Sequence, residues 1–289
     1  MSVRIVTDST ADLPTQVIEE LDISVVPLHI HVGEETFQDG VSISTEGFYN
    51  LLVGGDMLPK TSAPSSGMFT EVYERLAQET DEILSIHIST KLSATYASAF
   101  VGTEGVETPC RIEFVDSMQA SIGLGVLVVA AARMAREGRT LDEILRATCD
   151  AVPRTQFFGV LDTLDYLHKG GRIGKAATFL GSMLSVKPIL SLRQGIVHPV
   201  ERMRGRDRAI DRLCEIVQGY GSLESLAVAH TTTEAEMERL ADRLSQFFPS
   251  DEILRSRCGA TLGTYLGPGA LCVALIQGPD NDSGLPGFD

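Results

Sequence analysis

Residues 83–106 read ILSIHISTKLSATYASAFVGTEGV, and they decide the class of fold that the chain adopts. The first six residues are mostly apolar and β-branched, which predicts a buried strand. A hydroxyl-rich turn follows, and residues 93–106 have the composition of a helix. Parallel strands need such a crossover connection, so a strand, a polar turn and a helix in this order favour a parallel sheet.

The same alternation extends through the first half of the chain. It predicts strands at 3–7, 23–32, 83–88 and 112–115, and helices at 14–21, 45–52, 66–78, 93–106, 122–136 and 141–151. We therefore expect an N-terminal α/β domain over residues 1–153, with a mostly parallel sheet and helices on both of its faces.

The pattern changes after Pro153, where a hairpin with a Gln194-Gly195 turn enters the sequence. The predicted strands are 156–161, 187–192, 196–202, 225–229, 252–256 and 270–277, and the predicted helices are 207–218 and 233–248. A hairpin mixed with helices predicts a second α/β domain over residues 154–289 with a mixed sheet.

Composition narrows the classes of function. The 289 residues carry a net charge of −15, which disfavours binding to nucleic acid or to an anionic membrane surface. The five cysteines contain no C-x-x-C pair, so neither a disulfide framework nor a zinc site is expected. The longest apolar run, 122–132, is well short of the ~20 residues of a membrane span. With no leader segment at its start, the sequence predicts a cytoplasmic protein.

A hydroxyl-rich turn precedes the predicted helix 66–78. Ser65 or Ser66 is the natural N-cap of that helix, whereas Thr61 and Ser62 lie before the cap and are free to face a ligand. A helix N-terminus offers unpaired N–H groups and a partial positive charge, so adjacent hydroxyls complete a site for a carboxylate or phosphate.

Ser93 and Thr95 repeat this arrangement after the next predicted strand. Helix capping alone accounts for either turn. Because both turns lie at strand-to-helix junctions, where ligands bind in parallel sheets, we expect them to converge on one crevice.

The sequence offers no free-standing catalytic set. Asp8 and Asp12 bracket a hydroxyl segment, and with Ser93 they suggest a hydrolytic or phosphotransferase-like alternative, but their spacing also fits Asx-turn and capping chemistry. His29 and His31 share a strand face without a third metal ligand nearby. We therefore expect no metal, no cofactor and no catalytic residue.

Residues 176–186 are uncharged and apolar nearly all round. They are typical of a buried helix in the second domain, and they also suit the wall of a narrow tunnel for an alkyl chain. Each buried methylene contributes ~0.8 kcal/mol, so such a tunnel would bind a long chain with few polar contacts. If this segment walls a tunnel, we expect the alkyl chain to contact Phe179, Leu180, Met183 and Leu184.

Nine segments together resemble the DegV family, several of whose members are the fatty-acid-binding subunits of bacterial fatty acid kinase. The resemblance covers essentially the whole chain. The segments are TDSTADL at 7–13, TSAPS at 61–65, ISTKLSATY at 88–96, VDS at 115–117, LDTL at 161–164, KGGRIG at 169–174, KPIL at 187–190, MRGR at 203–206 and GPGA at 267–270.

The resemblance implies a three-layer N-terminal α/β domain and a C-terminal α/β domain that takes the acyl tail. It implies that the hydroxyls of Thr61 and Ser93 hold the carboxylate of a long-chain fatty acid. A separate kinase subunit that binds ATP would phosphorylate this carboxylate, so the chain itself would be no enzyme. Arg172, Arg204 and Arg206 lie in segments similar to the basic patch of the family, where that partner would dock.

Two positions depart from the family pattern. Tyr265 stands where a histidine is usual in a G-T-H-x-G-P-G segment beside the head group, and it is neutral near pH 7. Ala94 stands where glycine is usual. Besides the carrier and the enzyme, a lipid-sensing regulatory protein would use the same pocket.

Overall fold

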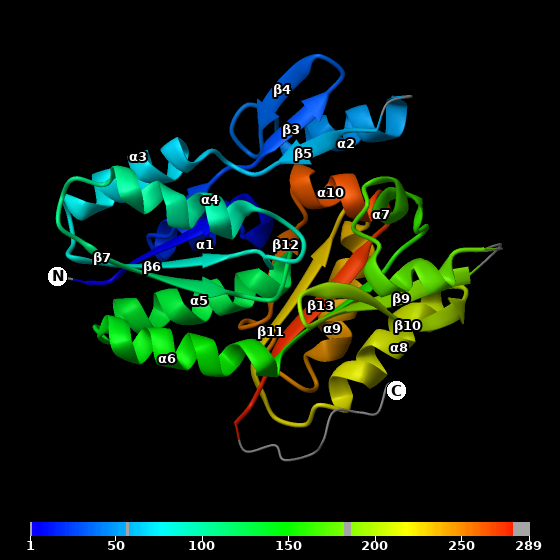
Figure 1. Ribbon diagram of the computed structural model, residues 1–289. Helices are drawn as coiled ribbons and strands as arrows, with labels where there is room; N and C mark the ends of the chain where they lie inside the picture. The colour runs from blue at the N-terminus through cyan, green and yellow to red at the C-terminus, as the bar shows by residue number, and fades with distance from the viewer. Residues whose placement is uncertain (1, 56–57, 182–185, 280–289) are drawn as a thin grey trace.

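A computed structural model describes residues 2–55, 58–181 and 186–279 (Figure 1). Its first sheet is parallel and has the strand order β2-β1-β6-β7. These strands are β1 (Arg4–Asp8), β2 (Ser24–Val26), β6 (Glu82–His87) and β7 (Arg111–Asp116). The parallel sheet predicted from the strand-turn-helix alternation is confirmed.

Helices cover both faces of this sheet. On one face, Phe69 and Tyr73 of α3 (Ser66–Ala77) and Ala99 of α4 (Thr95–Gly102) share a buried cluster with strand residues. On the other face lie α5 (Ile122–Arg136) and α6 (Leu141–Ala151).

A small antiparallel sheet, in the order β4-β3-β5, departs from the sequence prediction. The predicted strand 23–32 is broken into β2 and β3 (His29–Val32) at Pro27, which has no N–H to donate to a ladder. The strand β4 (Glu35–Gln38) was not predicted. The turn expected around Thr61 is the short strand β5 (Lys60–Ser62), and α2 (Thr45–Gly54) packs nearby.

The second large sheet is mixed, with the order β10-β9-β8-β13-β11-β12. Its strands are β8 (Thr155–Val160), β9 (Val186–Arg193), β10 (Ile196–Arg204), β11 (Leu223–His230), β12 (Leu254–Arg257) and β13 (Leu271–Gln277). The helices α8 (Arg206–Gln218) and α9 (Glu234–Leu244) pack on one face. The predicted mixed sheet and the α/β class are thereby confirmed.

The remaining described elements are short. They are the helices α1 (Thr15–Glu20), α7 (Asp165–Lys169) and α10 (Ala260–Leu266), and the 3₁₀ turns η1 (Ser9–Ala11), η2 (Thr103–Gly105), η3 (Val152–Arg154) and η4 (Gly174–Phe179). The start of the stretch 176–186, predicted as an α-helix or tunnel wall, is thus a 3₁₀ turn. Residues 182–185 lie outside the described part of the chain.

The apolar helix α5 lies between β6 and α6 in the view of Figure 1 and packs against both large sheets. It contacts β1 and β6 of the first sheet and β8, β11 and β13 of the second. The largest buried cluster consequently includes Ile5 and Leu84 from one half and Leu190 and Ala274 from the other. Burial of this shared face is what holds the two sheets together. No helix within the described ranges is long and apolar enough to cross a membrane.

Candidate functional site

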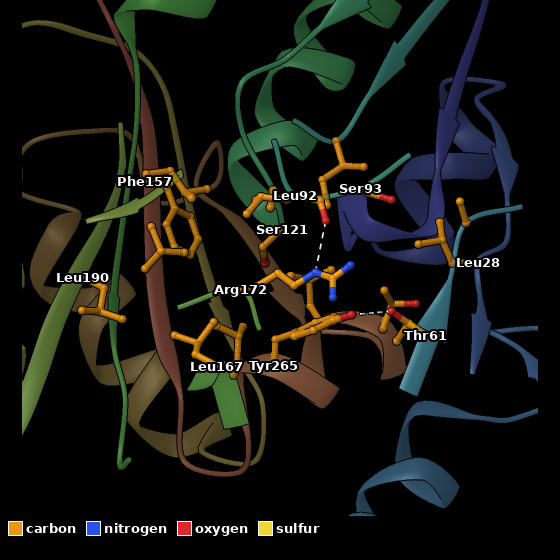
Figure 2. A pocket seen from close by; sticks show the side chains of 18 of the residues that line it. Leu28, Thr61, Leu92, Ser93, Ser121, Phe157, Leu167, Arg172, Leu190 and Tyr265 are labelled. Carbon is orange, nitrogen blue, oxygen red and sulfur yellow. Dashed lines mark hydrogen bonds between the residues drawn. The ribbon is translucent and has the colours of Figure 1, made fainter. Parts of the chain in front are cut away.

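A cavity of about 180 Å³ is lined by residues from both halves of the chain (Figure 2). This volume is many times the ~10–15 Å³ that one water molecule needs. Most of the lining is apolar, and examples are Ile88, Leu92, Phe157, Leu167, Leu190 and Leu262. Such a surface has no partners for water and favours an alkyl or aryl ligand.

The polar and charged side chains that line the same cavity include Thr61, Ser93, Arg172 and Tyr265. Thr61 Oγ1 and the Tyr265 hydroxyl share a hydrogen bond of 2.6 Å. The Arg172 guanidinium lies 5.3 Å from the centre of the Tyr265 ring. Arg172 Nε also donates to the carbonyl of Leu92, at 3.3 Å (Figure 2). Hydroxyls and a guanidinium are the donors that a carboxylate accepts from.

Two glycines allow the close contacts of this polar group. A Cβ on Gly170 would lie 2.6 Å from the ring of Tyr265, so only glycine lets this ring approach the backbone after α7. Gly195, at φ +79°, accepts a hydrogen bond of 2.9 Å at its carbonyl from Ser89 Oγ. That bond ties the turn before Ser93 to the β9–β10 hairpin.

Two carboxylates from the first half of the chain cap α10, the helix that carries Tyr265. Asp12 Oδ1 accepts from the Gly259 N–H at 2.8 Å. Asp39 accepts from the N–H groups of Ala260 and Thr261, at 3.0 and 3.1 Å. Burial raises the pKa of Asp12 to about 7, against the opposing effect of hydrogen bonds from Ser121 and Gly259. The caps satisfy the first N–H groups of α10 and fix the position of this helix.

Four of the five residues predicted to bind the head group line the cavity, and one does not. Thr61, Ser62, Ser93 and Tyr265 line the cavity, but Ser62 Oγ is bonded to His31 Nε2 at 2.9 Å. Thr95 does not line the cavity; it is buried, and its hydroxyl shares a 2.8 Å bond with Ser93 Oγ. Thr95 therefore orients Ser93 and does not face the cavity itself.

The residues of the enzyme alternative do not meet at the cavity. Asp8 is buried and accepts from Thr10, from His87 Nδ1 at 2.9 Å and from the Ile88 N–H. Asp12 is the cap described above. Of the set Asp8, Asp12 and Ser93, only Ser93 lines the cavity.

The residues predicted to wall the tail lie elsewhere. Phe179 and Leu180 are absent from the cavity lining. The 3₁₀ turn η4 leaves Leu180 39% exposed and places the ring of Phe179 4.5 Å from the guanidinium carbon of Arg202. Met183 and Leu184 lie outside the described residues. Phe179 and Leu180 therefore do not line this cavity, whose apolar wall includes Phe157, Leu167 and Leu190 from separate elements.

The three arginines predicted to dock a partner have different environments. Arg172 lines the cavity, whereas Arg204 is exposed. Arg206 is largely covered, and it forms a 2.6 Å ion pair with Glu236 and a 3.5 Å ion pair with Asp162. The structure thus does not gather all three in one free patch.

A second, outer pocket of about 300 Å³ adjoins the polar side chains. It shares Thr61, Arg172 and Tyr265 with the inner cavity and adds Lys60 and Lys169 to its lining. Because of these lysines and Arg172, the outer pocket suits an anion that lies outside the inner cavity.

No group of three or more His, Cys, Asp and Glu side chains suited to a metal ion occurs in the described part of the chain.

Comparisons with known proteins agree with this arrangement. A family model described as "Uncharacterised protein, DegV family" matches residues 2–278. A DegV domain-containing protein of Streptomyces coelicolor is 38% identical over 277 residues, or 94% of this chain and 98% of the relative. A DegV family protein from Thermus thermophilus, described for its fatty acid binding, superposes with a TM-score of 0.88 at 31% identity, over 96% of this chain and 100% of that chain. DegV from Bacillus subtilis, described as a fatty acid binding protein, does so with a TM-score of 0.86 at 31% identity, over the same shares.

Proposed function

Because the chain belongs to the DegV family, we propose that it binds one long-chain fatty acid, with the acyl tail in the apolar cavity and the carboxylate beside Thr61, Ser93, Arg172 and Tyr265. The observation that carries this proposal is the cavity itself, which is apolar along most of its wall and in which Tyr265 contacts both the hydroxyl of Thr61 and the guanidinium of Arg172.

The tail supplies most of the affinity in this account. Each methylene transferred from water contributes ~0.8 kcal/mol, so a chain of more than about a dozen methylenes offsets the cost of ordering the ligand. Most of the apolar wall comes from α7, β8, β9 and α10, which the proposed division at residue 153 assigns to the C-terminal half, while Ile88 and Leu92 come from the N-terminal half.

The head group is held by donors on separate elements. Thr61 on β5, Ser93 before α4 and Tyr265 on α10 offer hydroxyls, while Arg172 offers a positive charge. A carboxylate accepting from such donors forms charge-assisted hydrogen bonds, which are stronger than neutral ones.

We further propose that the chain presents this carboxylate to a fatty acid kinase subunit that binds ATP, and that it has no catalytic set of its own. The outer pocket, with Lys60, Lys169 and Arg172, supports this step because it adjoins the head-group donors and is cationic on an acidic protein. Exposed Arg204 would steer the partner. Because the kinase partner uses ATP, we propose that this reaction takes place in the cytoplasm.

Titration of the delipidated protein with fatty acids of increasing length tests the binding proposal. Saturation at one ligand per chain is expected, with affinity that increases as methylenes are added until the cavity is full. Equal affinity for octanoate and palmitate would contradict a tail-filled cavity.

The kinase step needs a separate assay. The protein loaded with palmitate, a fatty acid kinase subunit and ATP should yield an acyl phosphate, which hydroxylamine traps as a hydroxamate. Arg204→Gln should slow this reaction while leaving palmitate affinity unchanged. Formation of acyl phosphate without the kinase subunit would show instead that the chain is an enzyme.

A further inference from the structure

Two hydroxyls of the cavity wall, Thr261 Oγ1 and Ser191 Oγ, have no hydrogen-bond partner among the described residues, and Thr261 lies on the helix that carries Tyr265. Thr261 is 2% exposed, and its Oγ1 has no hydrogen-bond partner among the described residues. It lies one turn before Tyr265 on α10, and Leu262 and Leu266 of the same helix face also line the cavity. A buried hydroxyl without a partner costs ~1–3 kcal/mol, so its place in the wall of a ligand cavity calls for a ligand atom.

Ser121 supplies a second oxygen to this part of the wall. It is buried, lines the cavity and donates to Asp12 Oδ2 at 2.6 Å, which leaves lone pairs on its oxygen to accept a hydrogen bond. Asp12 also bonds the Gly259 N–H, directly before α10, so Ser121 and Thr261 both lie near the start of this helix.

The surroundings of these two hydroxyls disfavour a carboxylate. The carboxylate of Asp39 accepts from the backbone N–H of Thr261 itself, and Ser121 already donates its proton to Asp12. A ligand anion beside Thr261 would meet the like charge of Asp39 at short range in a buried site. Arg172, by contrast, lines the cavity beside Tyr265, where the carboxylate is placed above. The group that fits Ser121 and Thr261 is therefore polar and uncharged.

We propose that Ser121 and Thr261 form a subsite for an uncharged oxygen on the acyl chain, a hydroxyl or carbonyl a few carbons from the carboxylate. Thr261 would donate to this oxygen, and Ser121 would accept from it where it is a hydroxyl. Four residues of helix place Thr261 ~6 Å along the axis from Tyr265, which sets the separation from the head group. This inference rests on the proposed binding of a fatty acid.

Paired titrations with palmitic acid and a series of monohydroxylated palmitic acids test the subsite. We expect one hydroxylated isomer to bind about three- to tenfold more tightly than palmitic acid. Thr261→Val, which exchanges a hydroxyl for a methyl at constant shape, should abolish this preference, and Thr261→Ser should retain it. Thr264→Val is the matched control on α10, because its hydroxyl already donates to the carbonyl of Ala260 at 3.0 Å; it should leave the preference unchanged.

Several results would overturn the subsite. They are the absence of any preferred isomer, a preference that survives Thr261→Val, and an equal loss of affinity for palmitic acid in that variant, which would make Thr261 a carboxylate donor. Failure of the wild-type protein to bind any of these acids would contradict the proposed function instead, so the two failures are distinguishable.

Discussion

The hydroxyl of Tyr265 and Oγ1 of Thr61 share a 2.6 Å hydrogen bond across 204 positions of sequence. The bond joins β5 of the small sheet to α10, and both residues line the inner and the outer pocket. In the proposed complex both hydroxyls turn to the carboxylate. The protein therefore holds its head-group donors in place before the ligand enters, which lowers the cost of ordering them.

Thr61→Val should weaken palmitate binding about tenfold or more, because a hydrogen bond to a charged group is worth ~1.5–3 kcal/mol. The shape of the side chain is kept, so the melting temperature should change little. Ser62→Ala is the neighbouring control, since that hydroxyl is bonded to His31. Calorimetric titration of both variants checks the prediction, and equal losses in the two would refute a specific role for Thr61.

Tyr265→His should make fatty acid binding depend on pH. Histidine is protonated below its usual pKa of ~6.5, so its charge would attract the carboxylate and affinity should rise as the pH falls from ~8 to ~5.5. Tyrosine is neutral across this range and gives no such dependence. Tyr265→Phe should bind the fatty acid weakly at both ends of this pH range. If its affinity also changed with pH, another group would be responsible for the dependence.

Arg172→Gln should reduce the affinity for palmitate and its sensitivity to salt, because the positive charge that contacts the ring of Tyr265 is removed. Arg239→Gln is the matched control: it makes the same change of net charge on α9 and touches neither pocket. Titrations at low and high salt compare the two variants. If both variants lost the same affinity and the same salt dependence, the effect would come from the net charge of the protein and not from the position of Arg172.

Asp12 should make the protein less stable as the pH rises from about 4 to about 7. Burial raises its pKa to about 7, so the folded state binds more protons than the unfolded state in this interval and the free energy of unfolding falls with pH. The effect is at most ~4 kcal/mol, at ~1.4 kcal/mol for each pKa unit. Asp12→Asn should flatten this part of the profile. Urea unfolding at several pH values measures it, and identical profiles for both proteins would show that Asp12 is not the group responsible.

The fold was predictable wherever the information is local. The βα unit from β6 through Ser93 to α4, and the hairpin at Gln194-Gly195, appear in the structure because period and turn chemistry act over a few residues. The helix α10 was not predicted, because its seven residues depend on caps from Asp12 and Asp39, more than 200 positions away.

The cavity residues, too, were predictable only where a local motif marked them. Thr61 and Ser93 were found through their motifs, and the structure places both in the cavity wall. The tail wall was assigned to Phe179 because one apolar segment stood out, whereas the cavity is assembled by packing of separate elements. The role of Arg172 at the cavity and the unpaired hydroxyl of Thr261 are visible only in three dimensions.

Native mass spectrometry of the purified protein, followed by extraction and identification of its lipid, tests whether the chain binds a fatty acid. We expect a complex of one chain with one fatty acid, and uptake of one palmitate or oleate when the delipidated protein is mixed with either acid. Recovery of no fatty acid, together with no uptake of either, would contradict it.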